Sequence, residues 1–231
     1  MIFENELIAG VLIKRYKRFF VDIKVKNKVI TAHCPNTGSM MGLLKKGNKV
    51  WLTKSNDIKR KLKYTLQIIE VNGSKIGVNT HLTNKIFYES LLNGNIINLK
   101  KTDILFREKQ FNKNTRFDFF IKQKNKGIFI EVKNVTLSRF KNIAEFPDAV
   151  TERGLKHINE LLSAKKKGFD VYLAFVIQRE DCKKFKIAAD IDPNYKKLLT
   201  VALKNNLKVI CYDCKFLSKG IIINKKINLI K

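Results

Sequence analysis

Two acidic residues and a lysine occupy positions from which they could act together. In the stretch TRFDFFIKQKNKGIFIEVKNV (residues 115–135), apolar and polar residues alternate on both sides of a polar turn, which predicts two paired strands. The two-residue period places Glu131 and Lys133 on one face, and an antiparallel hairpin would bring Asp118 beside them. Neighbouring carboxylates repel each other unless a proton or a cation separates them. The pattern therefore predicts a site for Mg²⁺ or Mn²⁺, ions suited to phosphate substrates.

A purely structural interpretation of the same residues stays open. A Glu-x-Lys sequence arises by chance in a lysine-rich chain, and the pair would then lie on an ordinary solvated strand face. The order of the elements favours the functional interpretation. An aspartate near the end of one apolar strand is followed by Glu-x-Lys in the next, then by a helix pattern and another buried strand.

The charge of the chain indicates an anionic partner. The formal net charge is +27, which predicts binding to nucleic acid with a steep dependence on salt. The alternative is compositional, because abundant Lys, Asn and Ile are also typical of an AT-rich genome.

Composition also bounds the class of protein. With 231 residues, 45% of them hydrophobic, and three prolines, the chain predicts one large or two small folded domains. No apolar run is long enough to span a membrane, and the N-terminus lacks the pattern of a signal peptide. We therefore expect a cytoplasmic protein without a membrane partner, whose four cysteines are reduced. The lone Cys211-x-x-Cys214 is more typical of strand-end residues than of a zinc site. The sequence leaves open whether the protein forms a homodimer.

Residues 1–82 predict a small barrel that resembles an oligonucleotide-binding (OB) fold. About five short strand patterns occur here, and Asn72-Gly73 between apolar runs is a strong hairpin signal. Four cations interleave with three aromatic residues in the segment 14–20. Bases could stack on such rings while the cations contact phosphates; alternatively, the rings fill the barrel core and the lysines face water.

Residues 83–231 predict an α/β domain. The expected order is helix, three strands, helix, strand, helix, strand, with a loop over 136–146. Asp148 is expected to cap the second helix, with Val150, Gly154 and Ile158 on its apolar face. We place the boundary between the two domains near residue 82, because there the hydrophobic pattern changes from the period of strands to that of a helix.

Several stretches together resemble one family over almost the whole chain, the sugar fermentation stimulation protein family. They are LIKRYKRF (12–19), AHCPNTGSM (32–40), SNDIKRKLKYT (55–65), GVNT (77–80), RFDF (116–119), EVKNVTL (131–137), FPDAVTERGLKH (146–157) and IDPNY (191–195). The resemblance implies an OB-like barrel followed by a restriction-endonuclease-like αβββαβ domain with a PD-(D/E)xK core. It also implies a DNA-binding protein and a candidate regulator of sugar (maltose) use.

The resemblance further implies roles for individual residues. Asp118, Glu131 and Lys133 would form the nuclease-type catalytic motif, with Glu108 as a third acidic metal ligand beside Asp118 and Glu131. A divalent cation held there would polarise a phosphodiester and lower the pKa of a bound water, and Lys133 would orient that water or stabilise charge at phosphorus. The stretch after Glu108, KQFNKN, lacks the glycine expected of the family.

The candidate nucleic-acid contacts are spread over the chain. They are Lys14, Arg15, Tyr16, Lys17, Arg18, Arg60, Lys61, Lys63, Arg116, Thr151, Arg153 and Lys156. Those in 151–156 would face phosphate only if their helix lines the DNA cleft; otherwise the helix is structural.

Three functions remain in view. The first is DNA binding, largely independent of sequence, at a nuclease-type Mg²⁺ or Mn²⁺ site; the alternative is an active Mg²⁺-dependent DNA endonuclease. An RNA-binding module is the weaker third. A binding protein would gain nothing from carboxylates that repel phosphate, so the set at 118, 131 and 133 favours hydrolysis, whereas the resemblance favours binding.

Overall fold

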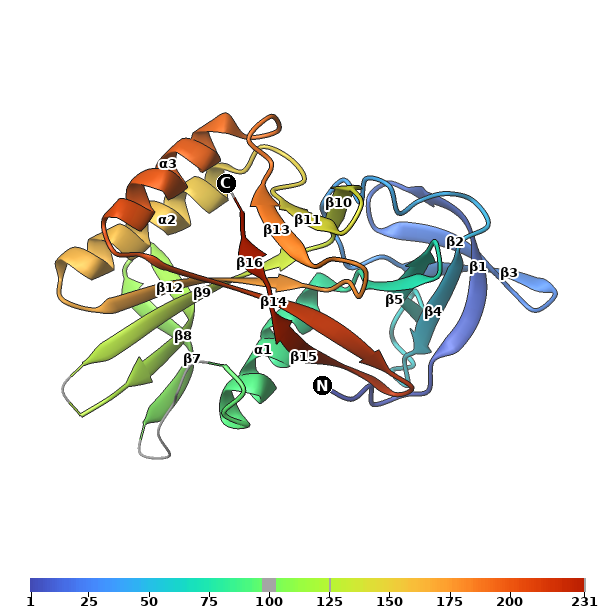
Figure 1. Ribbon diagram of the computed structural model, residues 1–231. Coiled ribbons are helices and arrows are strands. Elements are labelled where there is room, and N and C mark those ends of the chain that lie inside the picture. Colours follow the sequence, from blue (N-terminus) through green and yellow to red (C-terminus); the bar gives the residue numbers. More distant parts are fainter. Residues whose placement is uncertain (97–102, 125, 231) are drawn as a thin grey trace.

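A closed barrel and a larger α/β domain lie side by side in the computed structural model, which describes residues 1–96, 103–124 and 126–230 (Figure 1). The barrel strands are β1 (Ile8–Tyr16), β2 (Phe20–Val25), β3 (Lys28–His33), β4 (Lys49–Lys54), β5 (Tyr64–Val71) and β6 (Ser74–Gly77). Their order is β3-β2-β1-β4-β5-β6, and a pairing between His33 and Thr65 joins β3 to β5. This pairing closes five strands into the predicted OB-like barrel.

Local sequence explains much of the barrel. Alternation along β1, β2 and β4 buries Leu12, Val21, Ile23 and Leu52 completely in its core. The hairpin between β5 and β6 turns at Asn72-Gly73, whose φ angles of 50° and 78° are those of the predicted tight turn.

The larger domain is built on a six-stranded sheet of order β15-β14-β12-β9-β8-β7. Its helices and sheet strands are α1 (Thr83–Leu92), β7 (Ile104–Asn112), β8 (Thr115–Lys122), β9 (Gly127–Val135), α2 (Glu152–Lys166), β12 (Asp170–Ile177), α3 (Pro193–Lys204), β14 (Lys208–Leu217) and β15 (Gly220–Lys226). The strands β9, β12 and β14 run parallel, and the other pairings are antiparallel. The predicted order αβββαβ is therefore present as α1-β7-β8-β9-α2-β12.

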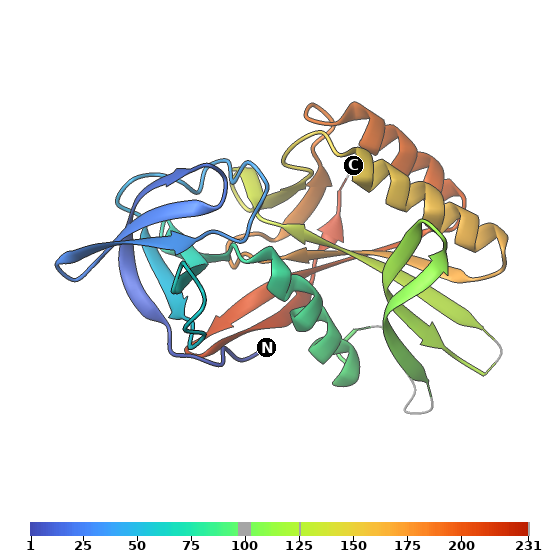
Figure 2. The same ribbon diagram turned by 180° about the vertical axis from the view of Figure 1, so that it is seen from behind.

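The helices cover both faces of this sheet. Figures 1 and 2 show α2 and α3 together on one side and α1 on the other. Leu173 and Phe175 of β12 pack in the cluster that contains Leu161 of α2, whereas Val176 packs in the cluster that contains Phe87 of α1. Because both faces are covered, the central strands β9 and β12 are buried almost without interruption.

A second sheet lies where the sequence predicted a loop. Residues 136–146 contain two short strands, β10 (Leu137–Phe140) and β11 (Ile143–Phe146), so the loop prediction is wrong. They join β13 (Lys184–Ile187) and β16 (Asn228–Leu229) in the order β10-β11-β13-β16. Strands of two to four residues carry too little periodicity to be recognised, and the partners of β11 and β13 are distant in sequence.

The second helix begins later than predicted. Thr151, not Asp148, caps α2: its side chain accepts a hydrogen bond from the Gly154 amide at 3.0 Å. Asp148 instead accepts hydrogen bonds from the amide and the hydroxyl of Ser39, which links the segment before α2 to the barrel. Val150 lies before the helix and is exposed, whereas Gly154 and Ile158 are buried as predicted.

The two parts are joined at several places besides the boundary predicted at residue 82. The 3₁₀ turn Thr80–Leu82 leads directly into α1. The Gly77 amide donates to the Gln178 carbonyl at 2.9 Å. Met1 does not belong to the barrel, because its carbonyl accepts from the amide of Ile221 in β15 at 2.8 Å.

Two further expectations concern the whole chain. The four cysteines are free and buried, and burial raises the pKa of the Cys211 thiol to about 12, which fits ordinary core residues. Within the residues that the structure describes, none of the helices has the length and apolar character needed to cross a membrane.

Candidate functional site

An open cleft lies where β8 and β9 separate beside α1 and α2. Asp118, Glu131 and Lys133 all line it, so the tertiary structure brings the predicted catalytic residues together. The other residues at its surface are Thr80, His81, Thr83, Asn84, Glu108, Arg116, Val132, Asn134, Arg153 and His157.

Asp118 stands at the point where the two strands separate. The last backbone pair of the hairpin is Phe119 with Ile130. Beyond it, Oδ2 of Asp118 accepts the Val132 amide at 2.7 Å, and Oδ1 accepts Asn84 Nδ2, also at 2.7 Å. Burial and the neighbouring charge of Glu131 raise the pKa of Asp118 to about 7, despite these two hydrogen bonds. The charge of Glu131 therefore makes ionisation of Asp118 more costly.

Glu131 is the most enclosed acid of the cleft, with 3% of its surface exposed. Burial by itself would raise the pKa of Glu131, but the hydrogen bond with His157 and the charge of Lys133 outweigh it and lower the pKa. The ammonium of Lys133 lies 2.8 Å from Oε1. The expectation that Glu131 and Lys133 share one face of β9 is confirmed.

Sequence reasoning did not predict that His157 and Asn84 contact the two acids. The imidazole of His157 contacts Oε1 of Glu131, and its Nδ1 lies 3.0 Å from Lys133 Nζ. In the sequence, His157 comes three positions after Gly154 and directly before Ile158, two residues on the buried side of α2. That helical spacing was the available signal. No sequence signal pointed to Asn84, since its hydrogen-bond partner Asp118 lies 34 residues away.

Glu108, the predicted third acidic ligand, does not lie beside Asp118 and Glu131. Glu108 is exposed on β7, with a φ of 50°, and lines the rim of the cleft. In the described ranges, no group of three His, Cys, Asp or Glu residues is arranged to hold a metal ion. The donors that fit a hard divalent cation are thus the carboxylates of Asp118 and Glu131. Such an ion completes its coordination with water or phosphate oxygens.

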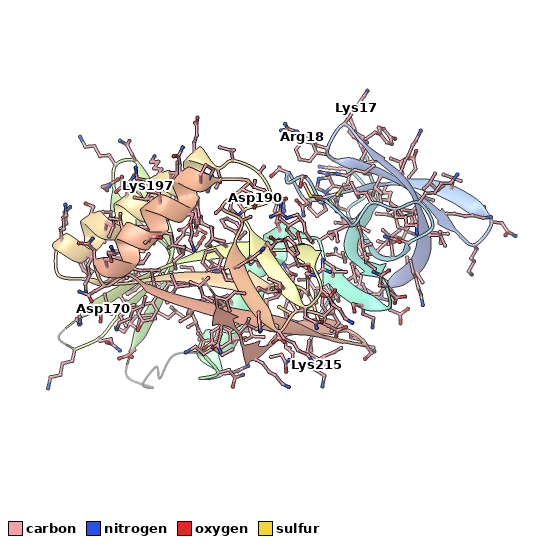
Figure 3. All side chains as sticks on the ribbon, turned by 45° about the horizontal axis from the view of Figure 1, so that its top comes forward. Lys17, Arg18, Asp170, Asp190, Lys197 and Lys215 are labelled. Carbon is pink, nitrogen blue, oxygen red and sulfur yellow. The ribbon has the colours of Figure 1, made fainter. Side chains whose placement is uncertain are left out.

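The predicted cationic contacts fall into two groups. Arg116 and Arg153 are exposed and line the cleft. Lys14, Lys17, Arg18 and Lys61 are exposed on the barrel, where Tyr16 and Arg60 are partly covered. Figure 3 shows Arg18 at the edge of the barrel that is turned toward the second domain. The exposed cations of this group are accessible to a phosphate backbone, whereas Tyr16 and Arg60 donate hydrogen bonds to Asp22 and Thr65.

The other group has partners within the protein. Arg15 donates to the carbonyls of Asn36 at 2.6 Å and Gly38 at 3.0 Å, and Lys63 donates to the carbonyl of Ile58 at 2.6 Å. Thr151 caps α2, and Lys156 donates to the Asn114 carbonyl at 3.1 Å. The cationic or polar head of each residue is therefore engaged in holding a loop or a helix end.

Two family models match the chain. The model of the sugar fermentation stimulation protein RE domain matches residues 81–220, and that of the SfsA N-terminal OB domain matches residues 13–78. The two matched ranges correspond to the α/β domain and the barrel.

Curated relatives are similar along their full length. A sugar fermentation stimulation protein homolog of Pelagibacter ubique (strain HTCC1062) is 51% identical over 230 residues, which cover 100% of this chain and 99% of that protein. A homolog of Maricaulis maris (strain MCS10) is 40% identical over 227 residues, 97% of each chain. Pyrococcus furiosus SfsA, solved in complex with Ca²⁺, superposes with a TM-score of 0.89 at 24% identity, covering 100% of this chain and 98% of that one.

Proposed function

This chain belongs to the sugar fermentation stimulation protein family, and on that premise we propose that it binds DNA, largely without regard to sequence, across the cleft that contains Asp118 and Glu131. One observation carries the proposal: the buried carboxylate of Glu131, the partly buried carboxylate of Asp118 and a lysine converge in an open cleft that two exposed arginines also line. Arg116 and Arg153 would contact phosphates on either side of the acids.

The carboxylates require a cation if DNA is to enter the cleft. Phosphate carries negative charge, and the charge of Glu131 already makes ionisation of Asp118 more costly. Their oxygens suit Mg²⁺ or Mn²⁺, which bind through one or two carboxylates together with substrate phosphates. The Ca²⁺ of the Pyrococcus furiosus structure supports the presence of a site for hard divalent cations in this fold. When bound, the ion would polarise a phosphate oxygen and acidify a coordinated water.

The protein's own residues would prepare the site for that ion. Asn84 and the Val132 amide hold the Asp118 carboxylate in one orientation. Lys133 and His157 do the same for Glu131. Fixed ligands of this kind reduce the reorganisation that binding would otherwise cost.

Hydrolysis of DNA is the second candidate function. It is favoured by the position of Lys133, whose ammonium lies in the cleft beside Glu131 rather than in solvent. From there it could stabilise negative charge that develops at a phosphorus atom.

The test separates binding from cleavage. Purified protein is incubated with supercoiled plasmid and a branched duplex in Mg²⁺, Mn²⁺, Ca²⁺ or EDTA, and Mn²⁺ binding is measured by calorimetry. Glu131→Gln is compared with Glu152→Gln, an exposed acid in the first turn of α2.

Loss of Mn²⁺ binding and of metal-assisted DNA binding in Glu131→Gln alone would support the site. Nicking that needs Mg²⁺ and Glu131 would identify a nuclease, and intact plasmid in every lane would exclude cleavage of these substrates. Absence of any DNA retention would refute the proposal.

A further inference from the structure

An exposed aromatic ring lies on the barrel, outside the cleft, in a pre-formed setting. Phe19 is 41% exposed and stacks on His33, with ring centroids 6.3 Å apart and an angle of 23° between the planes. The Phe19 carbonyl accepts the Cys34 amide at 2.8 Å, which fixes the backbone that carries the ring. Beside His33, Arg60 Nη2 lies 3.4 Å from Nδ1 and donates to Thr65 at 2.8 Å. We call Phe19, His33 and Arg60 the aromatic patch.

The aromatic patch adjoins the cleft. Two residues after His33, the Pro35 carbonyl accepts a hydrogen bond from the amide of Thr80 at 3.2 Å, and Thr80 lines the cleft next to His81. His81 is exposed and lines the cleft that contains Asp118 and Glu131. The intervening backbone is fixed as well, since the Thr80 hydroxyl donates to the Pro35 carbonyl at 2.9 Å.

Exposed cations lie near the aromatic patch and also in the cleft. Lys17 and Arg18 form the turn that precedes Phe19, and Figure 3 places Arg18 at the barrel edge next to the second domain. Arg116 and Arg153 lie at the other end, in the cleft. Aromatic rings that alternate with cations along a groove bind unpaired strands, because each base offers a face for stacking while its phosphate meets a cation. Bases within an intact duplex are already stacked on one another and cannot use such a ring.

We propose that the aromatic patch binds the unpaired strand of a nucleic acid, with a base stacked on Phe19, and that this strand continues past His81 into the cleft at Asp118 and Glu131. The substrate class is then a single strand or a duplex with an unpaired end, rather than an uninterrupted duplex. The inference rests on the proposed DNA binding and specifies its substrate.

The test compares nucleic acids that differ only in pairing. Fluorescence anisotropy gives the dissociation constants of an oligothymidylate, a blunt duplex, the same duplex with a single-stranded tail, and an oligouridylate, all in Ca²⁺. Phe19→Ala should weaken binding of the single strand and the tailed duplex about 5- to 100-fold, the usual effect of removing one stacking ring. Binding of the blunt duplex should not change, and Phe19→Tyr should restore the wild-type values.

Phe140→Ala is the matched control. Phe140 is 51% exposed on β10, and Lys186 Nζ lies 3.8 Å and Arg139 Cζ 5.8 Å from its ring centroid, but it belongs neither to the aromatic patch nor to the cleft. It should leave all four dissociation constants unchanged. The oligouridylate shows whether the unpaired strand can equally be RNA.

Two results would overturn the inference. The first is a wild-type protein that binds DNA but prefers blunt duplex; the second is a Phe19→Ala variant that weakens all ligands alike, or none. Either leaves the proposed DNA binding intact. A wild-type protein that retains none of the four ligands would instead refute both. A melting curve of each variant, compared with wild type, excludes loss of fold as the cause.

Discussion

The imidazole of His157 is hydrogen-bonded to the carboxylate of Glu131, although the two residues lie 26 positions apart. One belongs to α2 and the other to the central strand β9. The helix that packs on the sheet thereby fixes the orientation of the most buried acid in the cleft. Partners of this kind tune a metal ligand without touching the metal.

Replacing His157 should weaken the binding of divalent cations. In His157→Ala, Glu131 keeps Lys133 but has no hydrogen-bond partner on α2, and the affinity for Mn²⁺ should fall about 10- to 100-fold. Isothermal titration calorimetry measures this change. Asn159→Ala, an exposed position on the same helix, is the control. An unchanged affinity in His157→Ala would show that His157 serves only packing.

Removing the two arginines of the cleft should change the salt dependence of DNA binding. In Arg116→Ala/Arg153→Ala, the slope of log Kd against log salt should decrease by about 1.8, which is about 0.9 for each phosphate that the protein no longer neutralises. The melting temperature should not change, because both side chains are exposed. The slope is obtained from anisotropy titrations at several salt concentrations.

The matched control removes the same charge elsewhere. Lys197 lies on α3 and Lys215 on β14, and neither lines the cleft (Figure 3). Lys197→Ala/Lys215→Ala should change the slope less than the arginine pair does. Equal changes would mean that DNA binds the whole basic surface and not the cleft.

Arg15 should matter for stability rather than for phosphate binding. Its guanidinium joins the β1–β2 turn to the loop at Asn36 and Gly38, so Arg15→Lys should destabilise the protein by about 1–3 kcal/mol. Urea unfolding followed by circular dichroism measures the loss. Lys14→Ala, at the neighbouring exposed position, should cost little. If both variants are equally stable, Arg15 does not have this structural role.

Glu145 should make stability depend on acidic pH. Burial tends to raise the pKa of Glu145, but its hydrogen bonds with Arg139 and the charges of Arg139 and Lys186 lower it overall. A pKa lowered in the folded state means that the stabilisation is present above the unfolded value of about 4.3 and disappears as the pH falls through the folded value.

Glu145→Gln should therefore destabilise the protein most near neutral pH. The expected loss is about 1–3 kcal/mol at about pH 7, because Arg139 loses a charged partner, and it should shrink below about pH 4. Urea unfolding over a range of pH measures the difference from wild type. Glu152→Gln provides the exposed control. A difference that stays constant across the range would contradict this account.

Elements with a strong local period were predictable. The alternation in 115–135 predicted β8 and β9, and the start of α3 is equally local, since Asp192 caps the helix directly before Pro193. The strands β10, β11, β13 and β16 were missed because they are only two to four residues long, and the pairings of β13 with β11 and β16 join segments that are distant in sequence. The last long strand of the sheet, β15, was not predicted either. The predicted Asp148 cap failed because Ser39 of the barrel competes for that carboxylate, and no local pattern reports such a partner.

By itself, the sequence determined that Glu131 and Lys133 share one strand face near Asp118, since side chains alternate with a period of two. It also determined the positive charge and the presence of a barrel. Only the tertiary structure decided which cations are accessible. Arg15 and Lys63 are held by backbone carbonyls, while Arg116 and Arg153 line the cleft. It likewise brought Asn84 and His157 to the two acids. Hydrogen bonds between distant segments depend on how helices pack on the sheet, which the local period of the chain does not encode.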